Sequence, residues 1–99
     1  MKYRILFLPA ANDNLADIIE YLAGHSHQAA QNFYADLDKR LDLLEDMPFM
    51  CEAYEHDRYF RKMVIGKYLL FYAVKEEAGL IEIHRILHSA QDIRRLMDD

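Results

Sequence analysis

The chain contains the stretch Lys67-Tyr68-Leu69-Leu70-Phe71-Tyr72-Ala73-Val74-Lys75, an unbroken apolar run between two lysines. A run of this length, rich in aromatic and β-branched residues, predicts a central β-strand over 67–75. Residues 59–65 and 80–87 predict strands on either side of it, the first with mixed basic and apolar positions. Gly66 and Gly79 fall between these segments and predict the two hairpin turns.

The residues before this sheet predict a short strand and a helix. Residues 3–8 are a β-forming apolar segment that Pro9 ends. An apolar stripe at helical spacing follows, formed by Leu15, Ile18, Ile19 and Leu22. Gly24 fits the left-handed position that closes a helix, so we expect the helix to end there.

A second helix is predicted to begin at Ser26, whose side chain can cap it. Its apolar positions are spaced by three or four residues: Ala30, Phe33, Leu37, Leu41 and Leu44. Met47-Pro48 ends the helix, because a residue before proline is pushed out of the α region. The short link between the two helices predicts an antiparallel hairpin.

The predicted order is β-α-α-β-β-β, an α+β fold in a single domain over 1–99. The helix hairpin is expected to pack on one face of a four-stranded, mainly antiparallel sheet and to leave the other face free for function. A right-handed crossover places the first strand beside a later one. A short C-terminal helix is expected from about Ser89.

The composition fits a small globular protein, with 53% hydrophobic residues in 99. No apolar run approaches the ~20 residues that span a membrane, and the N-terminus lacks the features of a signal peptide, so we expect a cytoplasmic protein. Cys51 is the only cysteine, which excludes an internal disulfide and a thiolate metal cluster. We expect no metal and no cofactor.

The charge is unevenly distributed along the chain. The net charge is −5, which argues against broad nucleic-acid binding. The segment 58–67, however, holds four basic residues and no acidic one: Arg58, Arg61, Lys62 and Lys67. This pattern predicts a local site for an anionic group or, alternatively, a solvated strand edge that resists aggregation.

Several stretches of the sequence resemble a known family, the RelE/ParE toxins of type II toxin–antitoxin systems. The resemblance rests on Pro9-Ala10-Ala11, on Tyr59-Phe60-Arg61-Lys62-Met63-Val64, on Tyr68-Leu69-Leu70-Phe71-Tyr72 and on Ile83-His84-Arg85-Ile86-Leu87-His88. Together, and in this order, these stretches extend over nearly the whole chain. One departure is Leu8, where many relatives carry a capping Ser or Thr; Asn12 or Asp13 is the alternative cap.

The resemblance implies a toxin that a cognate antitoxin neutralises, with operator DNA contacted only through the antitoxin and no role at a membrane. ParE-like members inhibit DNA gyrase, whereas RelE-like members cleave mRNA on the ribosome without a metal. The long helix hairpin resembles the ParE branch, so we expect gyrase inhibition. The alternatives are a RelE-like endonuclease and a degenerate member that binds its antitoxin without toxicity.

For the nuclease alternative, Arg61, Arg85 and His88 are the candidate catalytic residues. Two guanidinium groups can bind phosphate and an imidazole can transfer a proton near neutral pH. Strand alternation, however, places Arg85 and His88 on opposite faces unless the strand ends or bulges between them, and Arg61 shares a face with apolar Met63. Arg58, Lys62, Lys67 and Tyr72 are the candidate binding residues, with core packing the expected role of the tyrosine.

Overall fold

We describe residues 2–98 of the chain from a computed structural model. Its elements in chain order are β1 (Arg4–Phe7), α1 (Pro9–His25), α2 (His27–Asp46), β2 (Arg61–Ile65), β3 (Tyr68–Lys75), the 3-10 turn η1 (Glu76–Ala78), β4 (Leu80–His88) and α3 (Ile93–Asp98). The predicted order β-α-α-β-β-β, with a short C-terminal helix, is therefore confirmed. The C-terminal helix begins at Ile93, later than the expected Ser89.

The strands form one sheet in the order β1-β4-β3-β2. β3 is central, as its apolar run predicts, and pairs antiparallel with both β2 and β4. β1 pairs parallel with β4, which places the first strand beside the last. Gly66 and Gly79 have φ values of +59° and +62° at the two turns, a conformation that favours glycine.

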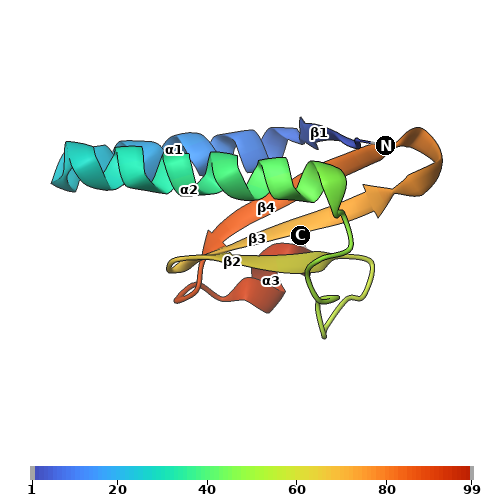
Figure 1. The fold of residues 1–99 in the computed structure, drawn as a ribbon. Helices are drawn as coiled ribbons and strands as arrows, with labels where there is room; N and C mark the ends of the chain where they lie inside the picture. The colour runs from blue at the N-terminus through green and yellow to red at the C-terminus, as the bar shows by residue number, and fades with distance from the viewer. Residues whose placement is uncertain (1, 99) are drawn as a thin grey trace.

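The helices α1 and α2 form a hairpin that covers one face of the sheet (Figure 1). Ser26 caps α2 as predicted, because its hydroxyl accepts a hydrogen bond of 3.2 Å from the Ala29 amide. The prediction that Gly24 ends α1 is wrong: α1 continues through His25, and the backbone at Gly24 has no positive φ. α1 begins at Pro9 without a side-chain cap at Leu8.

The main core lies between the hairpin and the sheet. The predicted stripes of both helices face it, and Phe33, Leu37 and Leu44 are buried against Met63, Leu70 and Ile83. The predicted α2 stripe is buried except at Leu41, which is partly buried. Outside the stripe, Asp36 forms an ion pair with Arg40. Burial of these side chains is the main force that holds the hairpin on the sheet.

The second face of the sheet is not left free, which corrects the prediction. A smaller core on that face consists of the buried Tyr54, Phe71 and Leu87. The residues packed around it come from the loop before β2, from β3 and from α3: Phe60, Leu69, Ile93, Leu96 and Met97. The second core follows from the continuous apolar run of β3, because the apolar side chains on its second face are also buried when other segments pack on them.

A β-bulge in β4 sets the direction of the side chains near its end. Phe71 pairs with Arg85, while the next residue, Tyr72, pairs with Ile83, so His84 is the extra residue. Ile83 and Ile86 therefore both face the main core. Between residues 2 and 98, the helices are too short or too polar to span a lipid bilayer.

Candidate functional site

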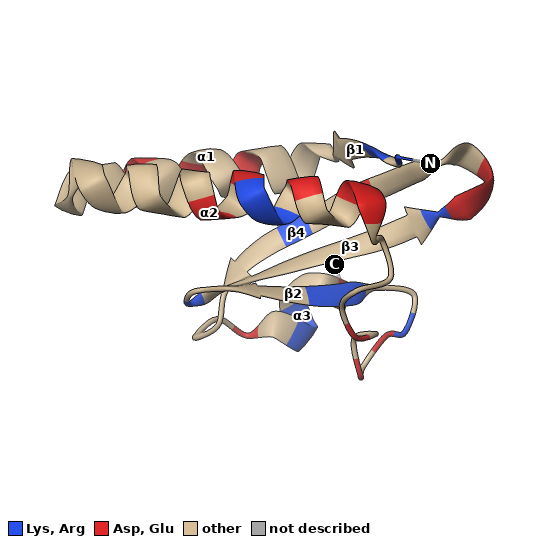
Figure 2. Cartoon of the chain, in the orientation of Figure 1, with Lys and Arg blue, Asp and Glu red and all other residues tan. Residues whose placement is uncertain are grey.

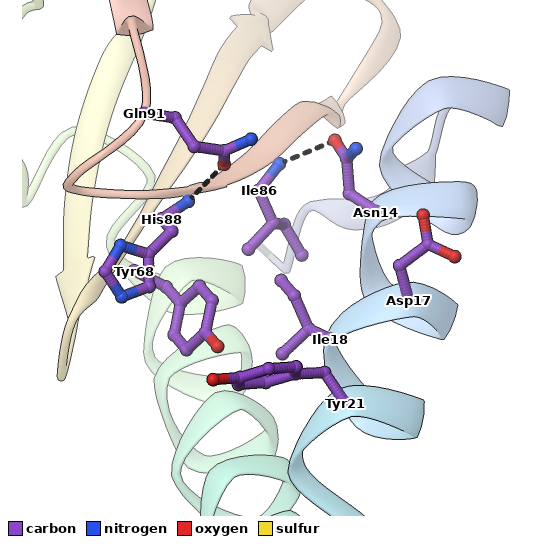
Figure 3. A pocket seen from close by; sticks show the side chains of 8 residues that line it. All are labelled: Asn14, Asp17, Ile18, Tyr21, Tyr68, Ile86, His88 and Gln91. Atoms are coloured by element: carbon purple, nitrogen blue, oxygen red, sulfur yellow. Dashed lines mark hydrogen bonds between the residues drawn. The ribbon is translucent and has the colours of Figure 1, made fainter. Parts of the chain in front are cut away.

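A groove opens where α1 meets the ends of β3 and β4 (Figure 3). It has a volume of about 290 Å³. Ile18 and Ile86 form its apolar floor, and Tyr21 and Tyr68 form an aromatic wall. Asn14 and Asp17 on α1 and His88 and Gln91 at the other side supply polar groups at the rim.

His88 is held in place by the turn that follows β4. Its Nδ1 accepts a hydrogen bond of 3.0 Å from the Ala90 amide, and its own amide donates to Gln91 Oε1 at 2.8 Å. In the neutral ring the proton therefore sits on Nε2. The imidazole lies edge-on to Tyr68, with ring centroids 5.2 Å apart. His88 is thus oriented as a donor at the groove rim.

Tyr68 connects this groove to a second one between α1, α2 and the β2–β3 turn. Burial raises the pKa of the Tyr68 phenol, so its hydroxyl keeps its proton to a higher pH than that of an exposed tyrosine. Its ring packs edge-on against Phe33 of α2, 5.2 Å between centroids. Besides Tyr21, Tyr68 and His88, the second groove is lined by Leu22, Ala29, Asn32, Phe33, Asp36, Ile65, Gly66 and Lys67. The two hollows share Tyr21, Tyr68 and His88 in their lining, and together we call them the hairpin groove.

The three candidate catalytic residues are not brought together. Arg85 pairs with Phe71 on the second face, whereas His88 pairs with Tyr68 on the hairpin face. The bulge precedes Arg85, so it does not turn the two side chains toward each other. Arg61 pairs with Tyr72, four residues along β3 from Tyr68, which corresponds to ~13 Å.

Arg61 and Tyr72 hold the loop that connects α2 to β2. The Arg61 guanidinium donates to the Cys51 carbonyl at 2.6 Å, and the Tyr72 hydroxyl donates to the Pro48 carbonyl at 2.9 Å. Tyr72 is completely buried, and this burial is the main cause of its strongly raised pKa. Its side chain is part of the core, as expected, and its predicted contact with a partner has no exposed surface to support it.

The remaining candidate binding residues do not form a single basic patch. Arg58 is exposed in the loop, Lys62 lines a small cavity with Tyr54 and Arg94, and Lys67 lies at the edge of the hairpin groove. Lys75, which the sequence did not single out, packs its ammonium 4.5 Å from the centre of the Tyr59 ring. In residues 2–98 no group of three His, Cys, Asp or Glu side chains is placed to hold a metal ion.

The residues that sequence reasoning missed are those of α1 in the groove. Asn14 Oδ1 accepts a hydrogen bond of 3.1 Å from the Ile86 amide, and thereby ties α1 to β4. Asp17 and Tyr21 follow at helical spacing, next to the apolar stripe. The sequence feature that could have indicated this groove is Tyr21, a large aromatic residue outside the apolar stripe. The structure shows that it is 61% exposed.

The strand order and the hairpin on one face are a fold that this chain shares with solved chains from toxin–antitoxin systems. The model of the family described as ParE toxin of type II toxin–antitoxin system, parDE, matches residues 5–93, and the chain belongs to that family.

Two solved structures share the fold. The chain is 19% identical to one in the toxin–antitoxin complex RelBE2 from Mycobacterium tuberculosis, with a TM-score of 0.62, 89% of this chain covered and 99% of that one. It is 15% identical to one in the chromosomal ParDE system of P. aeruginosa, with a TM-score of 0.71, 88% of this chain covered and 96% of that one. No curated protein matches the chain.

Proposed function

We propose that this ParE-family toxin inhibits growth by binding DNA gyrase, and that a cognate antitoxin neutralises it by placing an amphipathic helix in the hairpin groove. The observation that carries the antitoxin part is the groove itself, with an apolar floor, aromatic walls and a polar rim. A helix with one apolar face fits a groove of this kind. The two solved relatives, a RelBE2 complex and a ParDE system, support an antitoxin as the partner.

The choice of gyrase over the ribosome rests on the family and on the separation of the candidate catalytic residues. Metal-free RNA cleavage needs a base, an acid and a cation around one phosphate. Arg85 and His88 lie on opposite faces, and Arg61 holds a loop carbonyl. This arrangement favours inhibition of a protein target. The RelE-like endonuclease, with ribosome and mRNA as its target, is the alternative that the same assays test.

The test begins with induced expression in cells, with and without the antitoxin encoded by the neighbouring gene. We expect growth arrest without the antitoxin and rescue with it. The purified toxin is then assayed for inhibition of DNA supercoiling by gyrase and for cleavage of mRNA on translating ribosomes. Inhibition without cleavage supports the proposal, and cleavage with intact supercoiling overturns it. Normal growth without the antitoxin identifies a degenerate member and rejects both toxic activities.

A further inference from the structure

Four large apolar side chains are exposed where α2 ends and the next loop begins. We call Leu43, Met47, Phe49 and Met50 the Phe49 patch; their exposed fractions lie between 41% and 50%. Leu43 and Met47 are one helical turn apart, and Phe49 and Met50 follow directly after Pro48. Large exposed apolar groups that lie close together in the chain are candidates for an interaction surface, and methionine adapts well to partners.

The backbone beneath the patch is fixed, although its side chains face solvent. The Tyr72 hydroxyl and the Arg61 guanidinium hold the carbonyls of Pro48 and Cys51. The Arg61 guanidinium also lies 4.9 Å from the centre of the Phe49 ring. The Met50 amide donates to the Met47 carbonyl at 3.2 Å. A surface held in this way loses little conformational entropy when it binds, which favours recognition.

The charges around the patch indicate what kind of partner fits it. Asp42 and Asp46 each directly precede a patch residue in the chain and are exposed, and Figure 2 shows acidic positions near the end of α2. A partner with an apolar surface flanked by Lys or Arg side chains complements this arrangement. A second copy of the chain does not, because a symmetric contact brings the acidic residues of two copies together.

The patch and the hairpin groove are separate surfaces. The groove lies toward the α1–α2 turn and ends on α2 at Asp36, whereas the patch begins at Leu43, and no residue belongs to both. Asp36 and Leu43 are seven residues apart along α2, which corresponds to ~10 Å. A partner helix that contacts only the residues of the groove therefore need not cover the patch.

We propose that the Phe49 patch is the surface with which the toxin binds its target protein, through an apolar contact flanked by basic side chains of the target. This inference rests on the proposed function, in which the toxin acts on a protein. The antitoxin then binds in the groove and the target binds at the patch, so a substitution at one surface should affect only one of the two interactions.

The experiment compares two variants of the full chain. Phe49→Ser/Met50→Ser removes apolar surface from the patch, and Tyr34→Ser removes an exposed aromatic ring elsewhere on α2, 58% exposed, as the matched control. The measurements are growth arrest on induction, the concentration of toxin that halves supercoiling by purified gyrase, and affinity for the purified antitoxin. Circular dichroism and urea denaturation verify that each variant is folded.

We expect the patch variant to need at least about tenfold more toxin for inhibition. Its antitoxin affinity should change by less than about twofold, because the sites are independent. The control variant should behave like the unaltered chain. The charge variant Asp42→Lys/Asp46→Lys, which keeps the apolar side chains, should also weaken inhibition, by a factor that shrinks at high salt.

Three results overturn the proposal. The first is a folded patch variant as toxic as the unaltered chain, and the second is a variant that loses antitoxin binding while it keeps toxicity. The third is a dimer of the unaltered chain that the patch substitutions convert to a fully toxic monomer. If the unaltered chain arrests growth but leaves supercoiling intact, the gyrase proposal fails, while growth of the variants still decides the role of the patch.

Discussion

Arg85 and His88 lie three residues apart on β4, but their side chains lie on opposite faces of the sheet. Arg85 pairs with Phe71, at the core under α3, and His88 pairs with Tyr68, at the hairpin groove. A single phosphate cannot contact both side chains from one side of the sheet. The positions of Arg85 and His88 therefore argue against a joint catalytic role for the two residues.

We predict that the variant Arg85→Ala/His88→Ala still arrests growth when the antitoxin is absent. The reason is that neither residue belongs to the Phe49 patch, and the proposed target is a protein. Growth curves after induction, with circular dichroism to verify folding, provide the measurement. A folded double variant that permits normal growth, together with mRNA cleavage by the unaltered chain, would support the endonuclease instead.

A second prediction concerns two exposed tyrosines. Tyr21 lines both parts of the hairpin groove, whereas Tyr34 does not line it; their exposed fractions are 61% and 58%. Tyr21→Ala should weaken antitoxin binding at least about tenfold, because aromatic residues at the centre of an interface often dominate its affinity. Tyr34→Ala should leave the affinity unchanged. Titration calorimetry measures both, and equal affinities of the two variants would remove the groove from the antitoxin interface.

The third prediction is that Tyr72→Phe lowers the free energy of unfolding by about 1–2 kcal/mol. The substitution keeps the ring but removes the donor to the Pro48 carbonyl, and Pro48 is itself buried. A buried carbonyl without a partner carries a desolvation cost. Urea denaturation measures the change. A stability equal to that of the unaltered chain would mean that this hydrogen bond does not hold the loop.

Alkaline pH provides a fourth prediction from the same side chain. Burial, followed by interactions with Cys51, raises the pKa of Tyr72 above the ordinary 10.0. Above about pH 10 the unfolded chain releases a proton that the folded chain keeps, so stability is full below that pH and falls as the pH rises toward the folded pKa. Urea denaturation should show a shallower fall for Tyr72→Phe. Parallel pH profiles of the two proteins would contradict the raised pKa.

Much of the fold could be predicted because strand and helix periodicities were unambiguous. The run at Tyr68–Val74, the stripes of the two helices and the Met47-Pro48 exit specified the elements and their order. The bulge at His84 could not be predicted, since the sequence of β4 has no glycine or other local mark for it. The regular alternation nevertheless placed Arg85 and His88 correctly, because the bulge precedes both.

The site was less predictable, because it depends on contacts between distant segments. Asn14 and Ile86 are seventy-two residues apart in the chain, and only the fold joins them by a hydrogen bond. The basic residues at 58–67 predict a local patch. The loop, the strand and the turn that carry Arg58, Lys62 and Lys67 place them in different surroundings. The second face of the sheet was expected to be free, yet Tyr54 and residues of α3 pack there against Phe71.

The fifth prediction compares two glycines: Gly24, which the sequence predicts at the end of a helix, and Gly66, which it predicts in a hairpin turn. Gly24 lies inside α1, and apart from its chain neighbours and the nearby helix backbone no atom lies within 4 Å of an added Cβ, whereas Gly66 has a φ of +59° in the β2–β3 turn. Gly24→Ala should raise the free energy of unfolding by about 0.5–1 kcal/mol, because alanine restricts the unfolded chain and favours the helix. Gly66→Ala should lower it by about 1 kcal/mol or more, because a Cβ disfavours the left-handed conformation. Urea denaturation of both variants measures the two signs. If Gly24→Ala is destabilising, α1 ends before His25, as the sequence alone predicted.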